Sequence, residues 1–204
     1  MTVQRGLYTL AGTLLLIGFV TLGLLVDKRP PPVDVALADA FRGQHTQAAG
    51  QVAGLVTNVL GPVLPFALGA VLAVLAWRRR DLTALCVKLA VVLLLCRMTS
   101  LLAKPLFYRE RPREFPDLSY PSGHVVAVAC TGFVAVLLCA WTRPRLARLA
   151  ITIAAAATVL GALCRIVLGV HWLTDTAGSV LAVGGVGLIS AAGLGLLPLP
   201  EDRA

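Results

Sequence analysis

Six long runs of apolar residues divide the chain, and polar segments separate them. A helix that crosses a bilayer needs about 20 mostly apolar residues, and each run is of this order. The pattern predicts an all-α, polytopic membrane protein in which six transmembrane helices form a bundle, as a single domain over residues 1–204. The predicted spans cover approximately residues 7–26, 52–77, 82–103, 123–141, 146–168 and 174–197.

A longer polar connection, residues 27–51, follows the first span. The prolines at 30–32 stop that helix, because proline lacks a backbone N–H and cannot continue the hydrogen-bond ladder. Apolar residues then recur at helical spacing over residues 33–41, which predicts a short amphipathic helix at the membrane interface. His45 follows it and is assigned no role.

Composition agrees with a membrane protein, since 58% of the residues are hydrophobic, 14% are charged and the mean hydropathy is +0.85. The formal charge of +8 raises the alternative of nucleic-acid binding. The basic residues, however, lie between apolar runs rather than on one soluble face, so no nucleic-acid partner is expected. The cysteines lack metal-ligand spacing, which predicts free, buried thiols and no metal site. They are Cys86, Cys96, Cys130, Cys139 and Cys164.

Basic residues predict the orientation. The short junctions at 78–81 and 143–148 are dense in arginine and are therefore placed in the cytoplasm. The inner side then holds eight Lys and Arg residues, Arg203 among them, against seven outside. If Lys104 and Arg111 are retained for chemistry and left out of the count, eight basic residues lie inside against five outside. This count favours cytoplasmic termini, with the loop after the third span facing outward.

The most polar long segment is residues 104–124, which carries Lys104 and Arg111 and closes on Ser122-Gly123-His124. Backbone N–H groups at a helix N-terminus favour an anion, and arginine offers paired donors that match phosphate oxygens. This segment therefore indicates an anion site. A solvated basic loop between two helices is the alternative that this segment alone leaves open.

A second polar group contains Arg165, His171 and Asp175. Ionisable side chains at membrane depth are costly and are therefore functional candidates. His171 and Asp175 are four residues apart, so on a helix the carboxylate can reach the imidazole, fix its tautomer and make the other nitrogen a better nucleophile or base. The alternative is an interfacial histidine that caps a helix. Two crossings separate this group from the first segment, so both are expected at one membrane face.

Together these residues resemble the signature of the type-2 phosphatidic acid phosphatase superfamily, membrane lipid-phosphate phosphatases related to vanadium haloperoxidases. Its three parts are Lys104-x6-Arg111-Pro112, Pro121-Ser122-Gly123-His124 and Arg165-x5-His171-x3-Asp175. The six-span pattern extends the resemblance over nearly the whole chain. One departure is Cys164, where the family usually has serine. Cysteine is a weaker hydrogen-bond donor, which would loosen the phosphate cradle without removing a catalytic group.

The resemblance implies a role for each signature residue. His171 would be the nucleophile that forms a phosphohistidine, Asp175 would orient it, and His124 would exchange protons with the leaving group and water. The residues implied in phosphate binding are Lys104, Arg111, Ser122, Gly123 and Arg165. The resemblance thus implies a hydrolase without metal or other cofactor, because three cations would do the work of a divalent ion.

Several lipid phosphates fit such a site, because the motif residues contact only the phosphate. The leading expectation is a phosphomonoester of the phosphatidic acid or phosphatidylglycerol phosphate type, cleaved at the outer face of the cell membrane. The alternative substrate is a polyprenyl diphosphate, as in cell-wall carrier recycling. A lipid-binding or transport protein without catalysis is the non-enzyme alternative, against which His124, His171 and Asp175 argue. The six spans exclude a soluble haloperoxidase.

Arg97 lies outside the signature, seven residues before Lys104. Seven residues are nearly two helical turns, so both side chains share a face and Arg97 lies about 10 Å deeper. A charge at that depth is expensive unless it faces the bundle interior or water. Arg97 either bonds carbonyls of neighbouring helices or supports the positive field of the phosphate pocket by orienting Asp175 or a water.

Overall fold

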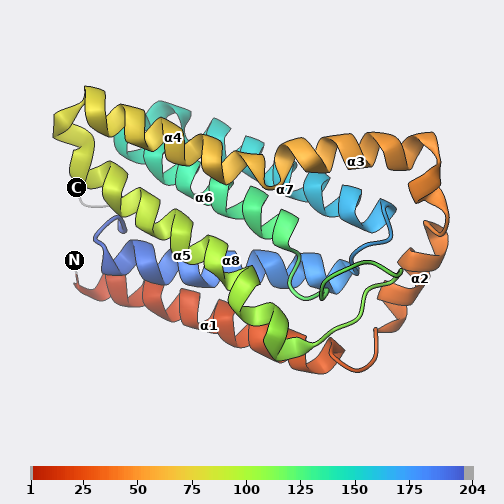
Figure 1. Cartoon of the computed structure of the whole chain (residues 1–204). Helices are drawn as coiled ribbons and strands as arrows, with labels where there is room; N and C mark the ends of the chain where they lie inside the picture. The colour runs from red at the N-terminus through yellow and green to blue at the C-terminus, as the bar shows by residue number, and fades with distance from the viewer. Residues whose placement is uncertain (1, 200–204) are drawn as a thin grey trace.

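The computed structural model describes residues 2–199, so Arg203 lies outside the described part of the chain. Figure 1 shows an elongated helical bundle, with α2 lying across one end. The α-helices are α1 Thr2–Val26, α2 Pro32–Ala40, α3 Ala48–Leu60, α4 Val63–Arg78, α5 Thr83–Phe107, α6 Gly123–Thr142, α7 Ala147–Val167 and α8 Leu173–Gly193. Three short 3-10 helices, Gln44–Thr46, Arg80–Leu82 and Pro144–Leu146, complete the described secondary structure.

Six segments among residues 2–199 are long and apolar enough to cross a membrane, which confirms the predicted all-helical, six-span architecture. They cover Val3–Val26, Ala48–Arg78, Arg80–Phe107, Gly123–Thr142, Pro144–Val167 and Leu173–Gly193. The third reaches Phe107 instead of residue 103, so Lys104 lies in the last turn of α5. The sixth ends at Gly193 instead of residue 197, because the chain turns at Gly195 with a left-handed φ of 71°.

The second span was predicted as one continuous helix, but it consists of α3 and α4 with a break at Gly61-Pro62. Pro62 has no N–H to donate, and its ring clashes with the preceding turn, so the helix is interrupted there. Gly61 closes α3 by donating its N–H to the Thr57 carbonyl at 2.8 Å. The ring of His124 packs against Gly61 where a Cβ atom would otherwise lie, so the break adjoins the candidate site.

The short helix predicted after the first span is present as α2, and the bundle buries a charged residue of it. Val33 and Val35 remain exposed, and the buried residue of the helix is Asp34, with 1% of its surface accessible. The Asp34 carboxylate pairs with Arg109, which compensates the hydration lost on burial.

Helix α8 packs against α1, α5 and α6, and glycines on α8 allow close approach. A Cβ atom at Gly178 would collide with the ring of Tyr120, and one at Gly187 would meet Phe133 of α6. The Tyr120 hydroxyl donates to the Phe19 carbonyl of α1 at 2.6 Å. The segment before α6 is thereby anchored to the bundle.

The candidate residues gather at one end of the bundle. Figure 1 shows the end of α5, the start of α6, the end of α7 and the start of α8 at this end, while α1 starts and α8 ends at the other. The prediction that both polar groups share one face is therefore confirmed. The five cysteines are free, and all but the half-buried Cys139 are buried, so burial was overestimated at that position alone.

Candidate active site

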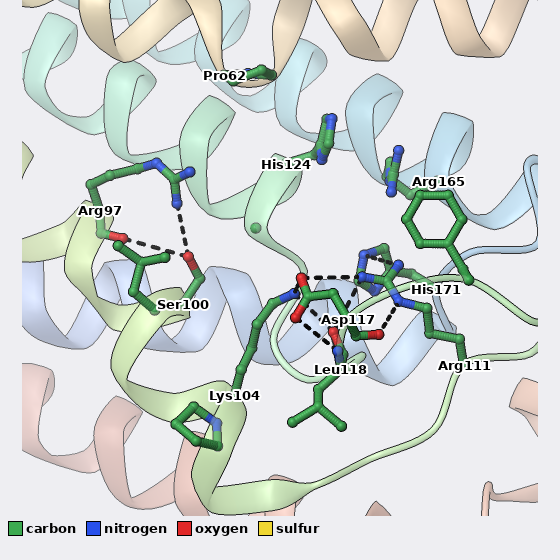
Figure 2. A pocket seen from close by; sticks show the side chains of 14 residues that line it. Pro62, Arg97, Ser100, Lys104, Arg111, Asp117, Leu118, His124, Arg165 and His171 are labelled. Carbon is green, nitrogen blue, oxygen red and sulfur yellow. Dashed lines mark hydrogen bonds and ion pairs between the residues drawn. The ribbon is translucent and has the colours of Figure 1, made fainter.

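A cavity of about 460 Å³ lies at this end of the bundle, among α5, α6, α7 and the loop before α6. Figure 2 shows the side chains that line it. The predicted residues on its wall are Arg97, Lys104, Arg111, Gly123, His124, Arg165 and His171. The other two, Ser122 and Asp175, are fully buried and absent from this wall.

Asp175 lies behind His171, away from the cavity. It is the third residue of α8, and its Oδ2 accepts the N–H of Trp172 at 2.8 Å, an arrangement that stabilises a helix start. The same oxygen lies 3.3 Å from His171 Nδ1 and accepts a hydrogen bond from the Ser119 hydroxyl. The predicted pairing of His171 with Asp175 is therefore present, but α8 begins at Leu173, so His171 precedes the helix and the two residues do not share a helix face as predicted.

His171 directs its other ring nitrogen toward the cations of the cavity. Its Nε2 lies 3.1 Å from an Arg111 nitrogen. Burial, with the nearby charges of Arg111 and Arg165, lowers the pKa of His171 to about 3 despite the opposing effect of Asp175. The ring is therefore neutral at pH 7. With the Nδ1 proton toward Asp175, Nε2 keeps its lone pair for reaction.

Arg111 is held by carbonyl groups on both sides. Its guanidinium donates to the carbonyls of Val170 at 2.7 Å, Asp117 at 2.8 Å and Leu118 at 3.2 Å. It also lies 4.7 Å from the ring centroid of Phe115. These contacts fix the guanidinium beside His171, where it can bind a phosphate oxygen.

Lys104 and Asp117 form an ion pair on the cavity wall. The Lys104 ammonium bonds the Asp117 carboxylate and donates to the Leu118 carbonyl at 2.8 Å. Partial burial opposes ionisation of Asp117, but the hydrogen bond and charge of Lys104 outweigh it and lower the pKa of the carboxyl. One cation of the cavity wall, Lys104, is therefore already paired with a carboxylate of the protein.

The start of α6 and the end of α7 contribute the remaining predicted groups. Ser122 caps α6 with an extended backbone, and Gly123 and His124 begin the helix. Among residues 2–199, the Ser122 hydroxyl and Arg165 Nε are buried without a hydrogen-bond partner. A buried polar group without a hydrogen-bond partner costs free energy. Such groups are typical of sites at which a polar ligand supplies the missing partner.

Arg97 reaches the cavity but does not contact Asp175. Its guanidinium donates to the Ser100 hydroxyl at 2.8 Å on the same helix. Figure 2 shows Arg97 and Ser100 at the opposite end of the lining from Arg111 and His171. The part of the hypothesis in which Arg97 orients Asp175 is therefore wrong, because other groups occupy both oxygens of that carboxylate.

Three residues close to Asp175 were missed by the sequence analysis. Arg109 had been counted only as a loop charge, but it is 2% exposed and donates to Asp175 Oδ1 at 2.6 Å. Ser119 had no signal, because a serine in a polar loop is ordinary. Asp34 offered one: it is the acidic residue in the first turn of a short helix whose side chains are mostly apolar.

Fold and site together define a polytopic membrane protein with a cationic cavity around a neutral histidine. The chain belongs to the PAP2 superfamily, whose family model matches residues 81–194. No curated protein sequence matches the chain.

The fold is similar to a solved structure described as the first transmembrane PAP2 type phosphatidylglycerolphosphate phosphatase from Bacillus subtilis. The TM-score is 0.70 at 21% identity, and the match covers 89% of this chain and 94% of the other. At this identity the likeness shows a shared fold.

Proposed function

We propose that the chain is a single six-span phosphatase domain that hydrolyses a lipid phosphomonoester through a phosphohistidine intermediate. The observation that carries this proposal is the position of His171 Nε2, 3.1 Å from Arg111 on the wall of a cavity that Lys104, His124 and Arg165 also line. Membership of the PAP2 superfamily supports it, as does the fold shared with a protein described as a phosphatidylglycerolphosphate phosphatase.

In the first step, the lone pair on His171 Nε2 attacks phosphorus. The P–N bond forms as the bond from phosphorus to the lipid oxygen breaks, and His124 gives its proton to that oxygen. Lys104, Arg111 and Arg165 stabilise the non-bridging oxygens, where most of the rate enhancement of phosphoryl transfer originates. Asp175 stabilises the positive charge that develops on the imidazole.

In the second step, His124 takes a proton from a water molecule, and the resulting hydroxide attacks phosphorus. The P–N bond breaks, its electron pair returns to His171 Nε2, and inorganic phosphate leaves. His124 is then protonated, as the first step requires. The N–H of Gly123 completes the phosphate cradle at the start of α6. The buried, unpaired Ser122 hydroxyl joins it if the side chain turns toward the cavity wall.

The proposed substrate is of the phosphatidic acid or phosphatidylglycerol phosphate type. Apolar side chains of Leu101, Pro105 and Pro62 line one part of the cavity, next to the break between α3 and α4. Leu101 is 57% exposed on the outside of the bundle, where a lipid would lie. An acyl chain can therefore remain in the bilayer while its phosphate reaches His171.

The test is phosphate release by the purified protein in detergent from phosphatidic acid, phosphatidylglycerol phosphate and a polyprenyl diphosphate. We expect release from the phosphomonoesters with a chelator present, and inhibition by orthovanadate, which can adopt the five-coordinate geometry of the transferring group. Preference for the diphosphate would support the alternative substrate. Activity that is lost on chelation and restored by a divalent ion would contradict metal independence. No release from any lipid by folded protein would refute the proposal.

A further inference from the structure

Asp34 lies on α2, outside residues 81–194 that the family model matches, yet it is connected to the candidate active site. Its carboxylate accepts the backbone N–H of Thr174 at 3.1 Å and the hydroxyl of the same residue. The other partner is Arg109, whose guanidinium donates to Asp34 Oδ2 at 2.7 Å. Asp34 thus binds the first turn of α8 directly and the loop before α6 through Arg109.

Arg109 joins Asp34 to Asp175. One guanidinium nitrogen bonds Asp34, and the other donates to Asp175 Oδ1 at 2.6 Å and to the Thr174 hydroxyl at 2.7 Å. Both carboxylates and the arginine are at most 2% exposed. The planar guanidinium holds its partners in fixed directions, so the position of Asp34 determines how Arg109 meets Asp175.

This arrangement has two consequences for His171. Because Arg109 holds Oδ1 of Asp175, the carboxylate is oriented with Oδ2 toward His171 Nδ1, 3.3 Å away. Because two carboxylates share one arginine, the group of Asp34, Arg109 and Asp175 keeps a net charge of about −1. That negative charge stabilises the positive charge that develops on the imidazole. If Arg109 were paired with Asp175 alone, its charge would cancel that of the carboxylate.

We propose that Asp34 is a positioning residue for the reaction, acting on Asp175 and His171 through Arg109 and Thr174. The proposal rests on the function proposed above, in which His171 is the nucleophile. The interfacial helix α2 is then part of the active site, although it contributes no residue to the cavity wall. Loss of the Asp34 charge slows the chemical step and leaves the cationic phosphate-binding groups in place.

The test compares Asp34→Asn with Asp39→Asn, a matched control on the same helix whose exposed carboxylate pairs with Arg42 on the surface. We expect Asp34→Asn to lower kcat roughly 10- to 100-fold, the range shown by groups that orient ligand histidines in metalloenzymes, with little change in KM. The inhibition constant of vanadate should rise, because a nucleophilic His171 would bond to vanadate as it does to the transferring phosphorus. That of inorganic phosphate, held by the cations, should stay unchanged. Asp39→Asn should resemble the wild type in all four constants.

Asp34→Glu keeps the charge and gives a second test, which also applies if Asp34→Asn fails to fold. We expect this variant to recover part of the lost kcat. Its inhibition constant for vanadate should still rise, while that for inorganic phosphate stays unchanged. Equal weakening of both inhibitors, or a wild-type kcat in Asp34→Asn, would overturn the proposal. Wild-type protein measured in parallel distinguishes failure of this proposal from failure of the proposed function. If the wild type releases no lipid phosphate, the proposed function itself fails. If the wild type is active, the variants decide the role of Asp34.

Discussion

The carboxylate of Asp117 accepts a hydrogen bond from the Lys104 ammonium on the cavity wall where a phosphate is expected to bind. Asp117 has a left-handed φ of 82°, uncommon for a residue other than glycine, and its Oδ1 accepts the N–H of Leu118 at 2.8 Å. The Lys104 ammonium is therefore already paired with an anion of the protein. A phosphate that binds Lys104 must compete with it.

Replacing Asp117 by asparagine should strengthen phosphate binding. The variant Asp117→Asn removes the competing charge, so we expect the inhibition constant of inorganic phosphate and the KM for lipid phosphate each to fall several-fold. Steady-state kinetics with phosphate as a competitive inhibitor measures both. Glu114→Gln, an exposed acid in the same loop, is the matched control for a general gain of positive charge. Weaker phosphate binding in Asp117→Asn would mean that Asp117 orders Lys104 for the substrate.

His171→Ala should abolish turnover, because no other imidazole in the site is paired with Asp175. Rapid quenching of the wild type with ³²P-labelled substrate should leave acid-labile, base-stable phosphate on the protein, and the variant should leave none. His45→Ala is the matched control, since His45 is absent from the cavity wall. Activity near that of the wild type in His171→Ala would exclude covalent catalysis at this residue.

The cavity should open at the extracytoplasmic face. In a cysteine-free background, an impermeant thiol reagent applied to intact cells should label a cysteine introduced at Glu114 and spare one at Thr142. Both positions are exposed; Glu114 lies in the loop before α6, and Thr142 is the last residue of α6, at the other end of that helix. Ser119 is unsuitable as a label site because it is buried against Asp175. Labelling at Thr142 alone would reverse the orientation.

Arg97 should support turnover from the cavity wall. With its guanidinium on Ser100, it adds positive charge to the cavity in which a phosphate is proposed to bind. We expect Arg97→Leu to lower kcat more than it lowers the thermal midpoint, and Arg97→Lys to recover part of the loss. Lys88→Leu, a charge removal nearer the other end of α5, controls for the hydrophobic change. A normal kcat in Arg97→Leu would remove Arg97 from the site.

The apolar runs alone predicted six spans, because a bilayer requires long uninterrupted apolar helices whatever the packing between them. The motif spacings likewise predicted the pairing of His171 with Asp175. Asp175 is the third residue of α8, and its carboxylate reaches back to the residues just before the helix, so the contact is local. These features depend on short-range rules, and the structure contains them.

Only the tertiary structure showed what lies behind that pair. Arg109 is 66 residues from Asp175 in the chain, and Asp34 is 75 residues from Arg109, so no local spacing relates them. They meet because the loop before α6 and the helix α2 fold over the same end of α8. The ion pair between Lys104 and Asp117 depends equally on how that loop turns. Contacts between distant segments depend on packing, and packing is decided by the whole bundle rather than by any one stretch of sequence.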